Sequence, residues 1–359
     1  MKSWTHTPAD KIRARGAGIP FQGSPGKNNS ITDVEGVQVG YMTLIKGDSI
    51  RTGVTGILPR PVDKISTPVF AGYHSLNGNG ELTGAIWMDE AGRCEGPITI
   101  TNTHSCGIAR DASIKWMNEN VDQSGSWSLP VAGETYDGVL NDINGFHVRE
   151  EHVIAAINNA HGGPIEEGSV GGGTGMICYD FKGGSGTASR VVESVGLNVN
   201  IGAFVQANFG RRDQLVIAGV PVGRSLGGGS SENERGSIIG IIATDAPLLP
   251  HQLKRLARRV SLGVGRSGSV SGHGSGDIFM AFSTANESAF HDEQKLASVQ
   301  YIPDSELDRI FAAVIQSVDE AILNALFAND TMEGFYGNRV EALPHNQVIE
   351  IMRQHNAFK

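Results

Sequence analysis

Runs of β-branched and other apolar residues, broken by Gly, Asn and Ser, alternate along this chain with longer stretches of helical spacing. The most continuous run spans residues 238–244, directly after Ser237, and is typical of a strand that is covered on both faces. A second buried strand is expected at residues 278–282, directly after Asp277. Shorter apolar runs predict further strands at residues 34–39, 85–88, 98–102, 190–205 and 214–220.

Four segments have the pattern of helices, and two of them lie near residues 107–120 and 149–160. A third begins at Pro250, where apolar residues recur with helical spacing and the cationic residues opposite them favour a solvated face over an acidic-partner site. A fourth follows Pro303, where residues 305–308 approximate a capping box. Strands and helices in both halves, without strict βαβ alternation, predict layered α/β packing with sheets inside and helices outside.

A polar, glycine-rich segment at residues 225–236 runs directly into the strand that Ser237 begins. Its composition is typical of an exposed connection inside one domain. Attack of the Ser237 hydroxyl on the carbonyl of Gly236 would cut the chain and expose a new α-amino group. That amine, with an ordinary pKa of about 8, could act as the general base for its own hydroxyl. A surface loop that enters a core strand would have the same local sequence, so this pair of residues does not decide the matter alone.

Composition narrows the class of protein. A chain of 359 residues with 48 glycines has room for a large core and many tight turns. Its net charge of −9 argues against non-specific binding to nucleic acid or anionic membranes. The odd, low count of three cysteines is typical of a reducing compartment and not of a disulfide framework. No apolar signal sequence follows Met1, and no run of about 18 apolar residues indicates a transmembrane helix. We therefore expect a single cytoplasmic domain over residues 1–359.

Several motifs with known chemistry do not fit the chain. Residues 223–227 match the nucleophile-elbow pattern, which needs a helix directly after it, but a polar glycine-rich segment follows instead. The glycine runs at 171–175 and 183–186 lack the Lys-Ser/Thr of a phosphate-binding loop and the third glycine of a dinucleotide site, which favours turns. The eleven histidines show no metal-ligand spacing, and His104 and Cys106 on one face of an expected strand favour a structural pair. No metal or cofactor is expected.

Three polar motifs could complete a site around a serine nucleophile. Ser275 and Asp277, separated by one glycine, could hold the new amine, although an ordinary turn would explain them as well. Glu134 and Tyr136 share a second motif, in which the carboxylate could bind a substrate ammonium and the phenol could donate to an oxyanion. Asn208, at a strand end, offers a second oxyanion donor.

Together these motifs resemble those of a known family, the self-processing aminopeptidases that include the DmpA-type L-aminopeptidase/D-Ala-esterase/amidases and the β-peptidyl aminopeptidases. The resemblance extends from Asn29 to the last helix, and its most specific stretch is residues 236–259. It implies a four-layer αββα sandwich, similar in architecture to N-terminal-nucleophile hydrolases but with different strand connectivity. It also implies a catalytic domain that cuts itself into residues 1–236 and 237–359.

The resemblance assigns roles on the nucleophile side of the site. It implies that Ser237 is the nucleophile and that the Gly236–Ser237 bond is cleaved. Ser275 and Asp277 are implied to assist the nucleophile. Relatives that cleave β-peptides have Glu where this chain has Asp277.

The resemblance also assigns roles on the substrate side. Asn208 looks like the oxyanion amide, and Tyr136 resembles the phenol used by the DmpA branch. Glu134 resembles the carboxylate that holds the free amine of a small peptide, amide or ester substrate. The implied activity is that of a serine aminopeptidase or amidase, in an oligomer of processed units.

Two alternatives remain open from the sequence. One is an acyltransferase resembling the ornithine acetyltransferases, which also mature by self-cleavage but use Thr at the cut, where this chain has Ser237. The other is a non-catalytic small-molecule-binding protein that uses the glycine-rich loops. This last alternative predicts one intact polypeptide, whereas the enzyme predicts two fragments.

Overall fold

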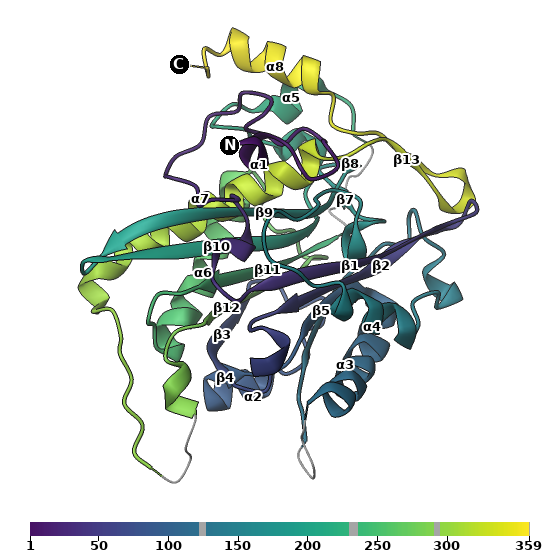
Figure 1. Ribbon diagram of the computed structural model, residues 1–359. Helices are drawn as coiled ribbons and strands as arrows, with labels where there is room; N and C mark the ends of the chain where they lie inside the picture. Colours follow the sequence, from purple (N-terminus) through teal and green to yellow (C-terminus); the bar gives the residue numbers. More distant parts are fainter. Residues whose placement is uncertain (122–126, 230–235, 291–294, 359) are drawn as a thin grey trace.

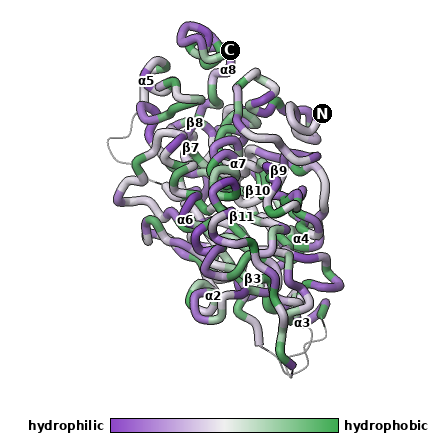
Figure 2. The backbone as a smooth tube through the Cα atoms, turned by 90° about the vertical axis from the view of Figure 1, so that its left-hand side faces the viewer, coloured by the Kyte–Doolittle hydropathy of each residue, from purple (hydrophilic) through white to green (hydrophobic). Residues whose placement is uncertain are grey.

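Two β-sheets pack face to face at the centre of the structure, and helices cover the outer face of each (Figure 1). The structure is a computed structural model and describes residues 1–121, 127–229, 236–290 and 295–358. The order of layers is helix, sheet, sheet, helix, which confirms the expected αββα sandwich. Both termini lie at the end of the molecule near α5 (Val222–Leu226) and α8 (His345–Gln354) (Figures 1 and 2).

The larger sheet has six strands in the order β4-β3-β12-β11-β10-β9. Its strands are β3 (Val69–Ser75), β4 (Arg93–Cys94), β9 (Gly184–Ser194), β10 (Leu197–Asn208), β11 (Ser237–Thr244) and β12 (Gly276–Ser283). Within it β11 and β12 are parallel, whereas β11 and β10 are antiparallel. The strand that Ser237 begins is therefore central, with a hydrogen-bonded neighbour on each side.

The smaller sheet has four strands in the order β1-β2-β5-β6. Its strands are β1 (Gln38–Lys46), β2 (Ile50–Leu58), β5 (Ile98–Asn102) and β6 (Val131–Thr135). Two short hairpins lie apart from the main sheets: β7 (Ile177–Cys178) with β8 (Phe181–Lys182), and β13 (Met332–Glu333) with β14 (Arg339–Val340).

The long helices form the outer layers. The helices α6 (Pro250–Arg266) and α7 (Leu307–Phe327) cover the six-stranded sheet, and α3 (Cys106–Asn120) and α4 (Glu150–Asn158) cover the four-stranded sheet (Figure 1). Two shorter helices are α1 (Lys2–Thr5) and α2 (Ala85–Ala91). All predicted apolar positions of α6 and α7 are buried, so their helical spacing is confirmed.

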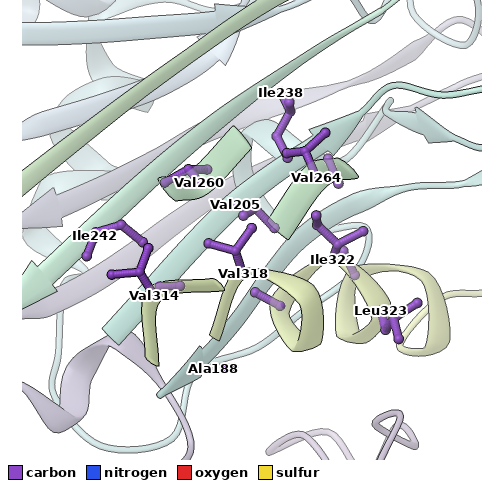
Figure 3. Close-up of a cluster of buried hydrophobic side chains, with 14 of the residues drawn as sticks. Ala188, Val205, Ile238, Ile242, Val260, Val264, Val314, Val318, Ile322 and Leu323 are labelled. Atoms are coloured by element: carbon purple, nitrogen blue, oxygen red, sulfur yellow. The ribbon is translucent and has the colours of Figure 1, made fainter. Parts of the chain in front are cut away.

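Alternation along β11 decides which side chain enters which layer. Ile239 and Ile241 pack between the two sheets, whereas Ile238 and Ile242 pack against α6 and α7. Figure 3 shows Ile238 and Ile242 among the valines of these two helices. Burial on both faces explains the unbroken apolar run, since each buried isoleucine contributes about 1.5–3 kcal/mol relative to an exposed one.

Several expectations from the sequence are wrong. Residues 85–88 form the first turn of helix α2, and residues 214–220 form a 3₁₀ turn and an isolated bridge instead of a strand. The strand expected at 34–39 begins only at Gln38. His104 lies in a 3₁₀ turn, whereas Cys106 begins α3, so the two do not share a strand face.

Two smaller expectations also need correction. The capping box expected at residues 305–308 is absent, because α7 has Glu306 as N-cap without a side-chain cap. Of the glycine runs, residues 171–173 form a 3₁₀ turn, whereas residues 184–186 already belong to β9.

One helix of the described chain, Asp304–Phe327, is long and apolar enough to cross a membrane, which the sequence expectation did not anticipate. However, 83% of its apolar window is buried inside the protein. Packing against the six-stranded sheet explains this hydropathy, and the pattern is typical of a core helix.

Candidate active site

Ser237 lies at the first position of β11, with only 6% of its surface exposed. Because side chains alternate along a strand, Ser237 points to the same side as Ile239, into the space between the two sheets. Its Oγ accepts a hydrogen bond of 3.0 Å from the backbone N–H of Gly276. That N–H is placed to stabilise negative charge on the oxygen when the hydroxyl loses its proton.

The register of β10 and β11 sets Asn208 directly opposite Ser237. Directly opposed residues of an antiparallel pair share one face of the sheet, so both side chains point the same way. Gly236 lies against the end of β10: a Cβ on it would be 1.9 Å from the Asn208 carbonyl oxygen and 3.4 Å from Asn208 Nδ2. Only glycine therefore fits before Ser237, and the Asn208 amide lies beside this glycine.

Two backbone groups fix the orientation of the Asn208 carboxamide. The N–H of Ile177 donates to Oδ1 at 2.7 Å, and Nδ2 donates to the carbonyl of Tyr136 at 2.9 Å. Reversing the amide would set donor against donor and acceptor against acceptor, so the orientation is determined by its partners. Nδ2 keeps a second N–H for another acceptor.

Ser275 and Asp277 lie beside Ser237, at the start of β12. Ser275 Oγ donates to Asp277 Oδ1 at 2.5 Å, and the N–H of Ile238 donates to the same oxygen at 3.2 Å. The pair is thus hydrogen-bonded to the residue that follows Ser237, and Gly276 between them contacts Ser237 Oγ. Asn77, to which the sequence assigned no role, extends the cluster with contacts to the carbonyls of residues 271 and 272.

Glu134 is buried in β6, in the sheet that faces β11, and its surface is 2% exposed. Its Oε1 accepts a hydrogen bond of 2.9 Å from the N–H of Glu81. Burial raises the pKa of Glu134, whereas Thr103 and the Glu81 backbone act against this rise. No ion pair to Glu134 is present within the described residues, so a buried carboxylate is left without a cation.

Close approach of two glycines brings Glu134 near Gly276, which pairs with Ser237 in the sheet. A Cβ on Gly80 would lie 3.0 Å from Glu134 Oε1 and 3.3 Å from the Cα of Gly276. Gly276 is the residue whose N–H contacts Ser237. A larger residue at position 80 would press on both groups, so glycine at this position lets the carboxylate lie close to Gly276.

Tyr136 lies beside Asn208 through its backbone. Its side chain is 46% exposed and packs over Gly138, where a Cβ would be 2.4 Å from the phenol oxygen. The structure thus joins the Tyr136 carbonyl to Asn208, and it places the phenol at the surface of the same turn.

Asp137 follows Tyr136 and has a buried carboxyl to which the sequence assigned no role. Oδ1 accepts from Asn141 Nδ2 at 3.0 Å, whereas Oδ2 has no hydrogen-bond partner among the described residues. Burial raises the pKa of Asp137 to about 7, although Thr52, Asn141 and Asn102 act against this. The unfolded chain, with the ordinary pKa of 3.8, loses this proton at lower pH than the folded chain. Asp137 therefore removes stability progressively as the pH rises from 3.8 to about 7.

We expect Asp137→Asn to have the melting temperature of the wild type near pH 4, and to exceed it at pH 8 by at least about 2 °C. The amide resembles the protonated acid in shape and carries no charge to bury. Thermal unfolding at both pH values, with exposed Asp48→Asn as the control, measures this. Equal differences at the two pH values would contradict it.

Within the described ranges, no group of three or more His, Cys, Asp or Glu side chains is placed to hold a metal ion. All three cysteines lie in the part of the chain that the structure describes, where they are buried and form no disulfide. Burial raises the pKa of Cys94 and of Cys106 to about 12, so these thiols are not poised as nucleophiles.

Residues 29–340 match the model of peptidase family S58. The β-peptidyl aminopeptidase BapA of Sphingosinicella microcystinivorans is 48% identical to this chain, over 97% of this chain and 93% of that protein. The chain also superimposes on the solved L-aminopeptidase D-Ala-esterase/amidase of Ochrobactrum anthropi with a TM-score of 0.91 and 47% identity, over 97% of this chain and 99% of that one. That protein is described as a prototype for the serine aminopeptidases and a variant of the Ntn hydrolase fold. A Burkholderia sp. β-aminopeptidase has a TM-score of 0.89 at 45% identity, over 96% and 99% of the two chains. The chain therefore belongs to peptidase family S58.

Proposed function

We propose that this chain is a self-cleaving serine aminopeptidase with Ser237 as its nucleophile. The observation that carries this proposal is the β10–β11 register, which sets the Asn208 amide opposite Ser237 and beside Gly236. The proposed nucleophile Ser237, the Asn208 amide and the Gly236–Ser237 bond thus lie together at the N-terminal end of the buried strand β11. The family and the relatives named above support the same activity.

The proposed self-cleavage uses the groups of this site and water. Ser237 Oγ attacks the Gly236 carbonyl carbon, the hydroxyl proton passes to the nitrogen of Ser237, and the C–N bond breaks, so that the acyl group moves from nitrogen to oxygen. Water then hydrolyses the ester, which leaves a carboxylate on Gly236 and a free α-amine on Ser237. The Asn208 amide stabilises the oxyanion in each step.

Turnover repeats this chemistry on a substrate. The Ser237 amine takes the proton of its own hydroxyl while Oγ attacks the carbonyl of the substrate's N-terminal residue. The C–N or C–O bond after this residue then breaks, and the amine passes the proton to the leaving amine or alcohol. Asn208 donates to the oxyanion, and Tyr136 is the candidate for a second donor. Ser275 and Asp277 hold the Ser237 amine, and water releases the acyl-enzyme.

The substrate is a small peptide, amide or ester with a free amine. The buried Glu134, which has no ion pair within the described residues, supports this assignment, because an ammonium group would supply a cation for its carboxylate. The relatives are a β-peptidyl aminopeptidase and an L-aminopeptidase D-Ala-esterase/amidase, so α-L, D and β substrates should all be assayed. Neither alternative, the acyltransferase or the non-catalytic binding protein, is favoured by these relatives.

We expect the folded protein to mature into residues 1–236 and 237–359, the second having 359 − 236 = 123 residues. A denaturing gel should show two bands, and N-terminal sequencing of the smaller fragment should read Ser-Ile-Ile-Gly. Active protein that runs as a single band would contradict self-cleavage.

The two fragments should stay together after the cut. Strands β11 and β12 of the second fragment lie between β10 and β3 of the first. Glu320 of α7 forms buried ion pairs with Arg190 at 2.7 Å and with Arg15 at 2.6 Å, both across the cut. Size exclusion should therefore elute both fragments in one peak.

Glu134 should make the enzyme an exopeptidase. A charge-assisted hydrogen bond to the substrate's ammonium is worth roughly 1.5–3 kcal/mol, or about 10- to 150-fold in kcat/KM. We expect wild type to prefer a free-amine p-nitroanilide over its N-acetylated form by this margin. In Glu134→Gln the preference should shrink, mainly because the free-amine substrate becomes poorer.

Exposed Glu90→Gln is the control for this experiment, because it removes a carboxylate from α2 without touching the site. Equal rates on both substrates in the wild type would contradict the aminopeptidase assignment and favour a general amidase or acyltransferase.

We further propose an oligomer of processed heterodimers in the cytoplasm, with neither nucleic acid nor membrane as a partner. The net charge of −9 supports the last point. Exposed apolar side chains such as Ile86 and Trp127 offer surfaces for contact between copies. Light scattering of the processed protein measures the assembly.

A further inference from the structure

Lys182, at the end of β8, is fully buried and has no ion pair among the described residues. Its Nζ donates to the carbonyl oxygens of Gly183 at 2.7 Å, Met176 at 2.8 Å and Gly173 at 3.5 Å. An ammonium group has three N–H donors, which match these three acceptors. Burial lowers the pKa of Lys182 to about 7, so the charged form is held here against a desolvation penalty.

Other hydrogen bonds already hold the backbone around Lys182. The N–H of Gly183 donates to the Met176 carbonyl at 2.9 Å, and the N–H of Lys182 donates to the Glu341 carbonyl at 2.8 Å. Asn329 Nδ2 donates to the carbonyls of Lys182 and Gly183. A methionine would fill the same volume without burying a charge. Packing and backbone support therefore do not require an ammonium group at this position, and its presence is explained by the groups on which its charge acts.

The peptide group between Met176 and Ile177 joins this lysine to Asn208. Its carbonyl accepts from Lys182 Nζ, and its N–H donates to Asn208 Oδ1 at 2.7 Å. At the other end of the carboxamide, Asn208 Nδ2 lies beside Gly236. We propose that Lys182 is a positioning residue that orients and polarises the Asn208 carboxamide through the Met176–Ile177 peptide.

The physical basis is cooperative hydrogen bonding in a buried chain of amides. A positive charge at one end draws electron density along the chain, and each hydrogen bond is strengthened by about 10–30%. The final N–H thus becomes a stronger donor to an oxyanion, and its orientation is set before the reaction begins. The inference rests on the proposed role of Asn208, and Lys182 itself does not touch the substrate.

A double-mutant cycle in the full chain tests this link. We expect Lys182→Met to lower kcat and the rate of self-cleavage by about 3- to 30-fold, with KM little changed. In an Asn208→Ala background the same substitution should have no further effect, because the donor that it acts on is gone. Self-cleavage is followed on gels with freshly synthesised precursor, and kcat is corrected for active sites by the burst of acyl-enzyme.

Stability separates positioning from a structural role. We expect Lys182→Met to melt no lower than wild type at pH 6, where Lys182 is charged, because the substitution removes a buried charge. Lys182→Gln, a neutral variant that still carries N–H donors, should lose the same rate. Exposed Lys46→Met should change neither rate nor stability.

The pH profile gives an independent readout. The kcat ratio of wild type to Lys182→Met should fall toward 1 as the pH rises from about 6 to 9, because Lys182 then loses its charge. Titration of the Ser237 amine changes kcat equally in both proteins, so it cancels in this ratio of the two kcat values. Charged and titratable groups around Lys182 are Lys11 and its partner Asp330, Cys178, and Glu341 with Arg339, and all are unchanged in the comparison.

Three results would overturn the proposal. The first is unchanged kcat and self-cleavage in Lys182→Met while Asn208→Ala lowers both. The second is an effect that persists in full in the Asn208→Ala background. The third is loss of folding in both Lys182→Met and Lys182→Gln, which would assign Lys182 to stability alone. Unchanged rates in Asn208→Ala itself would instead contradict the proposed oxyanion donor.

Discussion

Replacing Ser237 by alanine is expected to leave the chain uncut and to lower kcat by at least about 10³-fold. In the proposed mechanism both reactions use the same Oγ, and only Ser237 would acquire an α-amine next to its own hydroxyl. The buried position and the N–H of Gly276 at 3.0 Å single out this oxygen. A gel of the purified variant and a p-nitroanilide assay measure the two losses.

Ser225→Ala is the matched control, because this exposed serine of α5 begins the glycine-rich segment at residues 225–236. It should be cut and should turn over substrate like the wild type. Ser230→Ala should behave likewise, although Ser230 lies outside the described residues. Appreciable aminopeptidase activity in Ser237→Ala would move the nucleophile to another residue.

Replacing Asn208 by alanine is expected to lower kcat by about 10²- to 10³-fold, with a much smaller change in KM. The carboxamide is fixed by Ile177 and Tyr136, and its Nδ2 lies beside Gly236, whose carbonyl would carry the oxyanion during self-cleavage. Interactions made chiefly in the transition state lower kcat and kcat/KM together when they are removed. Self-cleavage should slow by a similar factor, since it forms the same oxyanion.

Asn198→Ala provides the control, because Asn198 is exposed near the other end of the same strand β10. Steady-state kinetics on processed protein and a time course of precursor cleavage give the two rates. A variant that binds substrate poorly but keeps its kcat would show that Asn208 serves binding instead of the oxyanion.

The sequence located the start of the central strand, and with it the candidate nucleophile, because local chemistry and burial coincide there. A serine between a glycine-rich segment and an unbroken apolar run predicts the first residue of a buried strand. In the structure β11 begins at Ser237. The spacing of apolar residues in α6 and α7 likewise predicts their buried faces. Such signals lie within a few residues of each other, so no knowledge of the fold is needed to find them.

Short apolar runs were less informative. Residues 85–88 have the composition of a strand, yet glycines at positive φ, Gly84 at 73° and Gly92 at 66°, bracket a helical turn there. That helix leaves Ile86 87% exposed and buries Met88. Four apolar residues fit either period, and only packing against the rest of the chain decides between them.

The sequence by itself determined the layered class, the long buried helices, the central strand and the chemical types that the site needs. Only the tertiary structure decided that Asn208 lies opposite Ser237, that Gly80 lets Glu134 approach Gly276 beside Ser237, and that Lys182 is linked to Asn208 through one peptide group. The physical reason is that these relations arise between segments far apart in the chain. Strand register and the close approach of two backbones set them, and neither leaves a pattern in a single stretch of sequence.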